Sequence, residues 1–431
     1  MTGVPDGRMV ANVSEQSMTD PQIGFNISDM EFWGRPLAER DAAFARLRAR
    51  PHPAFFTEID YGVIPAGAGY YALARHADVT EASRHPEVFS SVPSAVSIPD
   101  MPPEFAEYFG SLINMDDPRH AKIRRIVSRA FTPRMIQRFN DDVQSAADRI
   151  VDDLIERGPC DFVYNVAARL PLKFICDMMG IPESHYEEVL DHSNVILAGF
   201  DPEFLSEDAE VMATKLLGAG QAMQDLVQDL GRHRREHPTD DLTSALVNAN
   251  VDGEQLTDQE LGSFFIILAV AGNETTRNAI SHGLHLLTNN PDQRALLTSD
   301  LETYLPGTVE EIVRYASPVI WMRRTLTRDF EMNGHAYEQG DKVLLFYGSA
   351  NRDADVFTDP DRFDITRDPN PHVGFGGPGP HYCLGAHLAK REITVMFREL
   401  LTRVPEIRTS GEPDRLLSNF INGIKHLPCE F

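Results

Sequence analysis

A loop rich in glycine and proline, residues 375–385, carries a cysteine with the surroundings of a metal ligand. Its sequence is FGGPGPHYCLG, and the pattern predicts a helix that begins near Cys383. A thiol at the start of a helix is shifted towards the thiolate by the helix dipole and by nearby amide donors. A thiolate shielded on one side by a helix suits a metal better than it suits a nucleophile, and Gly385 leaves room for a flat ligand beside the backbone. A purely structural cysteine in a tight turn is the ordinary alternative.

A second candidate lies in the middle of a long apolar helix predicted over residues 258–287. The segment AGNETT places Gly272, Glu274 and Thr275 within one turn of that helix. A carboxylate and a hydroxyl in a buried helix are unfavourable unless something uses or satisfies them, and glycine costs about 1 kcal/mol relative to alanine. The segment therefore predicts a notch that admits a small molecule and water. A helix kink with back-bonded threonine is the alternative.

Three further groups of charged residues are candidates for binding or support. Glu311 and Arg314 are three positions apart on a predicted helix and pair on one face, most often as a surface ion pair. His120 and Arg124 share a helical face and are suited to bind one or two carboxylates. Arg324 opens a predicted strand and adds a third cation. Taken singly, each is an unremarkable basic or acidic residue.

The elements that must position these residues are mostly helices. Thr257 and Glu260 form a capping-box pattern at the start of the long helix. We predict one large domain, mainly α with minor β, over residues 29–431 and a mobile N-terminal tail over residues 1–28. Helical periodicity is found over residues 38–50, 77–84, 119–129, 133–156, 170–179, 183–197, 206–237, 240–249, 258–287, 292–299, 305–316 and 384–403. Strand signals are found over residues 59–73 (a hairpin), 325–332, 342–346 and 419–427.

Composition excludes several classes of protein. The chain has 431 residues, 42% apolar and 24% charged, which is typical of a globular protein. Its net charge of −25 disfavours nucleic acid as a partner. The four cysteines form no CxxC pair, so neither a zinc ribbon nor a disulfide scaffold is predicted. The longest apolar stretch, residues 261–273, is shorter than the roughly 20 residues of a membrane span, and no signal peptide is seen. We expect a cytoplasmic protein with reduced thiols.

Along the chain, the notch in the long helix is followed by the Glu311–Arg314 helix, then by the strand led by Arg324, and then by the glycine-rich loop with Cys383. This ordered set resembles a cytochrome P-450, a haem-thiolate monooxygenase. The resemblance covers the chain after the tail and includes residues 350–353 (ANRD) and 359–363 (DPDRF). It implies the cytochrome P-450 fold, with a long central helix over the haem. One departure is an extra residue near positions 377–378, which makes Phe375 to Cys383 eight steps where the family has seven. The insertion affects how Phe375 packs near the sulfur.

The resemblance implies a role for each candidate residue. Cys383 is implied as the thiolate ligand of the iron of haem b, and Gly272 as the residue that makes space for oxygen. Thr275 is implied to hydrogen-bond dioxygen, and Glu274 to relay protons. The residues implied to bind the haem propionates are His120, Arg124, Arg324 and His381. Those implied to shape the cofactor loop are Gly379, Phe375 and Gly385. A buried structural network is implied for Glu311 and Arg314, with Arg362 nearby.

Within the family, the chain is similar to mycobacterial enzymes that hydroxylate terminal methyl groups of methyl-branched lipids. The segments that carry this similarity are residues 273–280, 317–324 and 369–372. Related members oxidise the side chain of cholesterol or cholestenone, which is the alternative substrate class. The candidate walls of an apolar substrate pocket are Ile267, Val270, Ala271, Val319, Ile320 and Phe420, and ordinary core packing is the alternative for each.

The implied reaction needs electrons that the chain does not generate itself. No flavin fingerprint and no iron–sulfur cysteine spacing occurs in the sequence. A ferredoxin with its reductase and NAD(P)H is therefore implied as a partner. The basic residues that could form its docking face are Arg119, Lys122, Arg125, Arg129, Lys390 and Arg391.

Three rival functions fit parts of the pattern. A haem-thiolate protein that uses peroxide or isomerises its ligand would not need the Glu274–Thr275 pair. A non-enzymatic binder of haem or lipid would not turn over with a ferredoxin and NAD(P)H. A cysteine hydrolase would need a histidine and an acid tied to Cys383, and the sequence offers no convincing pair.

Overall fold

The computed structural model describes residues 23–60, 65–101, 109, 111–130, 133–197, 201–204, 209–250, 253 and 255–431. Most of the predicted N-terminal tail, residues 1–22, lies outside the described residues. Its last residues do not behave as a tail, since Ile23, Phe25 and Ile27 are buried against Phe32 and Trp33. The packed body therefore begins before residue 29, because three apolar side chains at alternate positions reach a core formed by the sheet.

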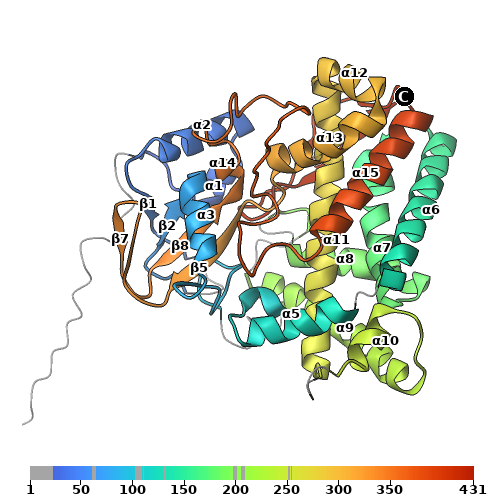
Figure 1. The fold of residues 1–431 in the computed structure, drawn as a ribbon, viewed down its shortest axis with the longest axis horizontal. Coiled ribbons are helices and arrows are strands. Elements are labelled where there is room, and N and C mark those ends of the chain that lie inside the picture. The colour runs from blue at the N-terminus through green and yellow to red at the C-terminus, as the bar shows by residue number, and fades with distance from the viewer. Residues whose placement is uncertain are drawn as a thin grey trace, which may run out of the picture.

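A single long helix, α11 (Asp258–Asn289), runs through the middle of the molecule (Figure 1). The predicted capping box is confirmed: the Thr257 side chain accepts from the Glu260 amide, and the Glu260 carboxylate accepts from the Thr257 amide. The helix packs against neighbours on several sides, so most of its residues are buried. It is the element against which the rest of the helical part is assembled.

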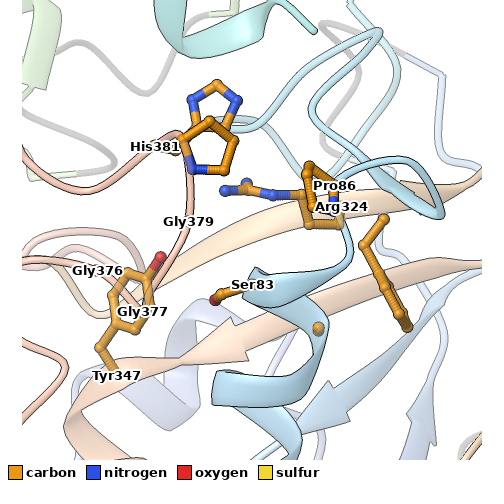
Figure 2. Close-up of a pocket in the computed structure, with 11 residues that line it drawn as sticks. Ser83, Pro86, Arg324, Tyr347, Gly376, Gly377, Gly379 and His381 are labelled. Carbon is orange, nitrogen blue, oxygen red and sulfur yellow. The ribbon is translucent and has the colours of Figure 1, made fainter. Parts of the chain in front are cut away.

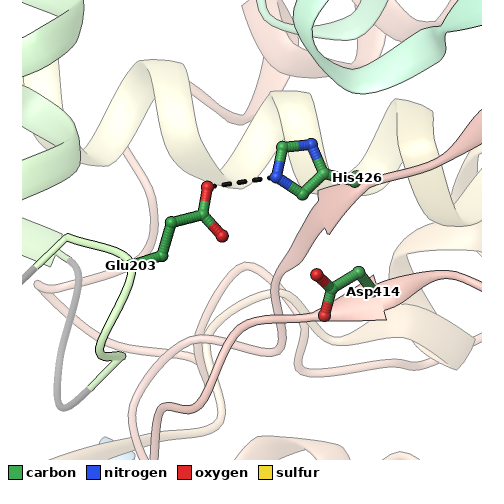
Figure 3. Close-up of side chains that lie close together, drawn as sticks. All are labelled: Glu203, Asp414 and His426. Atoms are coloured by element: carbon green, nitrogen blue, oxygen red, sulfur yellow. Dashed lines mark hydrogen bonds and ion pairs between the residues drawn. The ribbon is translucent and has the colours of Figure 1, made fainter.

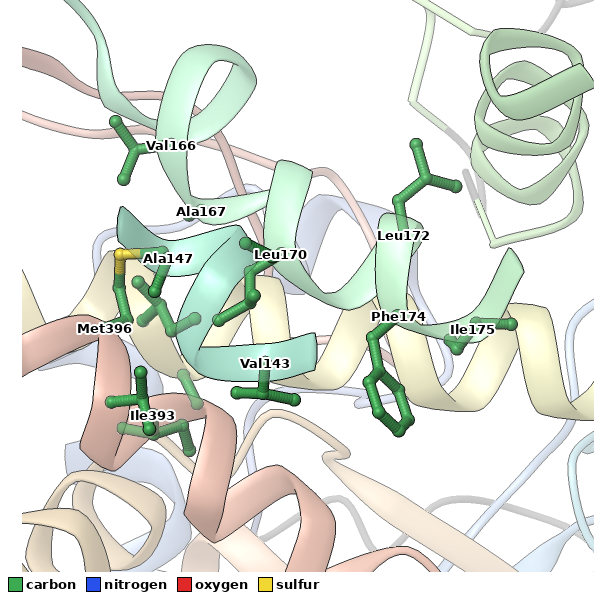
Figure 4. Close-up of a cluster of buried hydrophobic side chains, with 14 of the residues drawn as sticks. Val143, Ala147, Val166, Ala167, Leu170, Leu172, Phe174, Ile175, Ile393 and Met396 are labelled. Atoms are coloured by element: carbon green, nitrogen blue, oxygen red, sulfur yellow. The ribbon is translucent and has the colours of Figure 1, made fainter. Parts of the chain in front are cut away.

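The helices on one side of the molecule form its main core. They are α5 (Arg119–Ala130), α6 (Pro133–Arg157), α7 (Arg169–Met179), α8 (Tyr186–Leu197), α9 (Ala209–Glu236), α10 (Leu242–Val247), α12 (Pro291–Ser299), α13 (Leu301–Ala316) and α15 (Ala386–Arg403). Short 3-10 turns lie at Ser111–Asn114 and Glu183–His185, and one π-helical turn lies at Val163–Ala167. Figure 4 shows part of the core, where Val143 of α6, Leu170 of α7 and Met396 of α15 converge.

A five-stranded sheet lies on the other side of α11, with strand order β1-β2-β8-β5-β3 (Figure 1). Its strands are β1 (Ala54–Phe56), β2 (Tyr70–Leu73), β3 (Phe89–Ser90), β5 (Trp321–Leu326) and β8 (Lys342–Phe346). Only the β2–β8 pair is parallel. The short helices beside this sheet are α1 (Met30–Trp33), α2 (Leu37–Arg48), α3 (His76–Arg84) and α14 (Tyr347–Ala350).

Smaller sheets complete the fold. β6 (Phe330–Met332) pairs with β7 (His335–Tyr337), and β10 (Asp414–Arg415) pairs with β11 (Ile424–His426). A three-stranded sheet has the order β4-β12-β9, with β4 at Cys160–Asp161, β12 at Pro428–Glu430 and β9 at Arg408–Thr409. The mainly α fold with minor β is confirmed. Among the helices that the structure describes, none combines the length and the apolar content needed to cross a membrane.

Two predicted boundaries were wrong in ways that affect the site. Arg324 does not open a strand: it is the fourth residue of β5, which begins at Trp321 and pairs with β8. The start of β5 was not predicted, because the aromatic and basic residues before Thr325 do not alternate between apolar and polar. The helix after the cysteine begins at Ala386, two residues later than predicted, with Gly385 at its cap.

A cluster of charges fastens the C-terminal hairpin to the segment after α8. His426 donates from one ring nitrogen towards Asp161 at 2.6 Å. Its other ring nitrogen donates towards Glu203 at 3.0 Å (Figure 3). Glu203, Asp414 and His426 lie close enough to share one metal ion. The Lys425 ammonium is already 3.0 Å from Glu203 and 3.6 Å from Asp414, so a cation of the chain itself neutralises these carboxylates. The cluster is therefore explained as a set of ion pairs that holds the C-terminal hairpin in place.

Candidate functional site

The cysteine loop is closed by a hydrogen bond between its two ends. The Cys383 amide donates to the Phe375 carbonyl at 3.0 Å. Gly376 and Gly379 have φ angles of 90° and 152°, which glycine adopts without strain. A Cβ at Gly379 would lie 2.3 Å from the carbonyl oxygen of Ser83, so the middle of the loop packs tightly on α3. The loop is thus held both by the bond between its ends and by its packing on α3.

The Cys383 side chain is accessible, and open space lies beside it. A Cβ built on Gly385 meets no heavy atom within 4 Å, as expected for a position that leaves room for a flat ligand. Although the residue is exposed, desolvation by neighbouring protein groups raises the pKa of the Cys383 thiol. The Gly385 amide and the Arg124 charge act in the opposite direction. The backbone amide thus favours the thiolate in the predicted direction, but desolvation is the larger effect.

Four predicted basic residues converge next to this loop. The rings of His120, on α5, and His381 are 4.3 Å apart between centroids. Arg124, one turn after His120, donates to the carbonyl of Tyr382 at 2.7 Å. The pKa of His381 falls to about 3, because the side chain is desolvated and Arg324, His120 and Arg124 all repel its proton. The fold thus brings together all four residues that were predicted to bind carboxylates.

A small pocket is lined by residues of the cysteine loop, α3 and β5, and Figure 2 shows the Arg324 guanidinium pointing towards His381 beside it. Arg324 is buried, and its guanidinium donates to the neighbouring carbonyl of Arg323 at 2.7 Å. Desolvation lowers the pKa of Arg324, with Tyr347 and Asp116 acting in the opposite direction. A buried guanidinium satisfied by one carbonyl has donors left for an anionic ligand.

These groups fit a ligand that carries carboxylates and a metal. The Nε2 atom of His120 is buried and has no hydrogen-bond partner among the described residues. Unpaired buried donors destabilise a protein unless a ligand satisfies them. The repulsion among the cations would be relieved by one or two carboxylates, and the nearby Cys383 sulfur is a soft metal ligand. A haem with its two propionates matches this donor set.

The long helix α11 is open along one stripe. In a helix whose residues are otherwise mostly buried, Ile267, Leu268, Ala271, Gly272 and Thr275 keep partial or full exposure. They recur at intervals of three and four, so they share one face. Among the residues that the structure describes, this face is only partly covered, as is expected of the wall of a binding cavity.

The predicted notch at Gly272 is narrower than expected. A Cβ added there would lie 2.8 Å from the Cδ1 atom of Ile175, on α7. Much of the space that the glycine leaves is therefore taken by a side chain of the neighbouring helix. Since this contact is the far end of a flexible side chain, the space at Gly272 depends on the rotamer of Ile175.

The carboxyl group of Glu274 and the hydroxyl group of Thr275 lie in different surroundings. The Thr275 hydroxyl donates to the Ala271 carbonyl at 2.7 Å, which is the back-bonded arrangement, and lies on the open face. Glu274 is buried and paired with Arg277, whose guanidinium also donates to Asn194 of α8 at 2.9 Å. Burial raises the pKa of Glu274, and Arg277 opposes this shift. The carboxyl group therefore lies between α11 and α8.

The six predicted pocket walls divide into three pairs. Ile267 and Ala271 belong to the open face of α11, as predicted. Val270 and Ile320 are buried in hydrophobic clusters, which is the core-packing alternative. The other two walls, Val319 and Phe420, are partly buried where the C-terminal segment meets the start of β5.

Glu311 and Arg314 form a fully buried pair rather than a surface one. Arg314 donates to both oxygens of Glu311 at 2.7 Å, and also to the carbonyls of Asn351 and Pro360. Arg362 lies nearby, as the resemblance implied, but the further cation of the network is another residue. Arg362 contributes only its backbone carbonyl, and the second cation beside Glu311 is Arg367, 3.3 Å away. The Glu311 carboxylate thus pairs with both Arg314 and Arg367. These pairs fix the segment that leads into the cysteine loop.

The predicted docking residues are only partly available to a partner. Arg119 lies 3.7 Å from Glu260, and Lys390 lies 2.6 Å from Glu310, so both already have acidic neighbours. Lys122 and Arg125 lie on α5, and Arg391 lies on α15. The side chain of Arg129 is outside the described residues. A basic surface on α5 remains the core of this prediction.

Three residues of the site were missed by sequence reasoning. Ser91 lies 3.0 Å from His381, Ser83 packs under the loop glycines, and Tyr347 lines the pocket with Arg324. They come from segments far apart in the chain, and nothing in their local sequence marks them. Only the sheet and α3 place them beside the cysteine loop.

Comparison with known proteins places the chain in a family. The cytochrome P-450 profile matches residues 106–405. A methyl-branched lipid omega-hydroxylase of Mycobacterium tuberculosis is 49% identical over 412 residues, covering 95% of each chain. A steroid C26-monooxygenase of Mycolicibacterium smegmatis is 40% identical over 369 residues, covering 84% of each chain.

Solved structures agree with this assignment. A Mycobacterium marinum cytochrome P-450 in complex with pseudoionone superposes with a TM-score of 0.88 at 41% identity, covering 93% of this chain and 97% of that one. This family has haem b held by a cysteine thiolate, the cofactor that the donor set around Cys383 fits. The chain belongs to the cytochrome P-450 family and is a haem-thiolate monooxygenase.

Proposed function

We propose that this monooxygenase hydroxylates an unactivated, terminal C–H bond of an apolar lipid such as a methyl-branched fatty acid or an isoprenoid. The observation that carries the proposal is the open face of α11, where Ile267, Leu268, Ala271 and Thr275 keep partial or full exposure in an otherwise mostly buried helix. An aliphatic surface of this kind favours an apolar substrate. The similarity to omega-hydroxylases over 95% of the chain supports a terminal site of attack.

The proposed roles of the cofactor-binding residues follow from their positions. Cys383 would hold the iron, and His120, Arg124, Arg324 and His381 would bind the propionates. When bound, haem b with a thiolate ligand supplies the activation of dioxygen by two electrons and two protons. The Glu311 network keeps the segment before the loop in place and takes no part in the chemistry.

The residues of α11 are proposed to transfer protons and to exclude water from the site. Glu274 holds a proton in a buried position and exchanges it through the polar contacts between α11 and α8. Thr275 presents its hydroxyl on the open face, where turning away from the Ala271 carbonyl lets it donate to a ligand. The aliphatic residues beside it exclude water and orient the substrate.

Steroid side chains are the second candidate substrate. A steroid C26-monooxygenase is 40% identical to the chain, and its reaction is also at a terminal carbon. Both substrate classes therefore fit a narrow apolar cavity with one reactive end. The higher identity to the branched-lipid enzymes, 49%, favours the first candidate.

We also propose a ferredoxin as the electron donor. The chain is acidic overall, with a net charge of −25, yet Lys122 and Arg125 lie close together on α5. Local positive charge on an acidic protein favours a small acidic partner. Because exposed charges are screened by salt, electron transfer through such a face weakens as ionic strength rises.

One assay tests the substrate and the donor together. The holoprotein is given a ferredoxin, its reductase and NADPH, with a panel of methyl-branched fatty acids, isoprenoids and cholestenone. We expect branched acids or isoprenoids to yield terminal alcohols at the highest kcat/KM, with a rate that falls as salt is raised. Preferred turnover of cholestenone supports the second candidate. Internal hydroxylation only, or turnover with hydrogen peroxide but none with the ferredoxin, would contradict the proposal.

A further inference from the structure

Two of the four cysteines lie opposite each other across a β-ladder, far from the cysteine loop. Cys160 of β4 and Cys429 of β12 are direct antiparallel partners. They are 269 positions apart in the chain, and their Sγ atoms are 3.9 Å apart. The fold, rather than local sequence, brings these two thiols together.

The backbone around the pair already has the geometry of a disulfide. Directly opposed residues of antiparallel strands have Cα atoms about 4.5 to 5.5 Å apart, and disulfides span about 4.4 to 6.8 Å. Cys429 is also paired with Thr409 of β9 on its other side, so its strand is held on both edges. A sulfur–sulfur bond of about 2.05 Å therefore requires the two side chains to rotate. The backbone of both strands stays in place.

The two thiols differ in how easily a reagent reaches them. Cys160 is half-buried, whereas Cys429 is 2% exposed. Desolvation raises the pKa of both thiols, that of Cys429 to about 12, and Arg157 opposes the shift at Cys160. Because thiolates are the reactive form, Cys160 is the first to react. Cys176 is fully buried on α7, and Cys383 lies in the cofactor loop.

We propose that Cys160 and Cys429 form a reversible disulfide by exchange with a low-molecular-weight disulfide. The Cys160 thiolate attacks one sulfur of the reagent, whose S–S bond breaks and releases one thiolate. The Cys429 thiolate then attacks the Cys160 sulfur and releases the second thiolate. The two protein thiols lose two electrons and two protons, and the reagent becomes two thiols.

The bond would fasten the C-terminal strand to the junction between α6 and α7. The segment just before β12 contacts the substrate side of the molecule: Ile424 donates to Asn278 of α11, and Asn422 donates to the carbonyl of Pro318. A disulfide between residues so far apart in the chain lowers the conformational entropy of the unfolded state. It therefore stabilises the fold. Oxidation is therefore expected to raise the melting temperature by a few degrees.

The experiment uses the holoprotein in buffers of increasing oxidised-to-reduced glutathione ratio. Free thiols are blocked with N-ethylmaleimide, and the digest is mapped by mass spectrometry without reduction. We expect a peptide pair linking Cys160 to Cys429 that grows with the ratio and disappears with dithiothreitol. Cys176→Ala should keep the linked pair, whereas Cys160→Ser and Cys429→Ser should each lose it.

Three outcomes would overturn the proposal. The first is absence of the linked peptide at every ratio in the wild-type chain, a result that does not depend on any variant folding. The second is linkage only after denaturant is added. The third is complete linkage with no difference in melting temperature from Cys160→Ser under the same buffer, which would remove the stabilising role.

Discussion

Replacing Glu311 with glutamine is expected to lower the free energy of unfolding by about 3 to 5 kcal/mol, the usual cost of breaking a buried ion pair. The carboxylate is fully buried, and it accepts hydrogen bonds from Arg314, the Asp364 amide and Asn370. Glutamine keeps the shape but removes the charge, so Arg314 and Arg367 are left buried without an anion. Urea denaturation of the holoprotein, followed by circular dichroism, measures the loss.

The neighbouring residue supplies the control for this change. Glu310 pairs with His372 and Lys390, but its side chain is 34% exposed. Exposed pairs contribute about 1 kcal/mol or less, so Glu310→Gln should change the unfolding midpoint little. Equal losses in the two variants would contradict the view that Glu311 is the anion on which the segment before the cysteine loop depends.

Replacing Glu274 with glutamine is expected to slow turnover by about 100-fold, at the lower end of the range for general acid–base groups. The change keeps the side chain's volume beside Arg277 and Asn194, but glutamine holds no transferable proton. Substrate binding, measured by the optical shift of the haem, should be preserved because Glu274 faces α8 and not the open face of α11. The readout is product formation at saturating substrate and ferredoxin.

A carboxylate at the start of the same helix is the matched control. Asp258, in the first turn of α11, pairs with Arg235 far from the open face. Asp258→Asn should leave turnover near the wild-type rate. If Glu274→Gln also stays within about twofold of the wild type, the proposed proton role of Glu274 is wrong.

The sequence was most informative where one short segment contains both the chemistry and its support. The capping box of α11 and the loop from Phe375 to Cys383 involve residues close together in the chain, and both were predicted. The convergence of His120 and His381 was implied only through the family resemblance, since no local pattern joins two residues so far apart. The fold then placed their rings 4.3 Å apart.

Predictions were incomplete where a partner from another element decided the outcome. Arg367 rather than Arg362 lies beside Glu311, because the chain turns between them and reverses which side chain faces inwards. The sequence predicts free space at Gly272, but in the fold Ile175 of α7 lies against this position. The Cys160–Cys429 pair depends on a ladder between strands of two or three residues, too short to be predicted from periodicity.

The central claim is that the Cys383 sulfur is the ligand of haem iron. The carbon monoxide difference spectrum of the reduced holoprotein tests it most directly. We expect the red-shifted band of thiolate-ligated haem in the wild type and its loss in Cys383→His, with haem content retained. A wild-type spectrum without that band, or a band that survives in Cys383→His, would contradict the account.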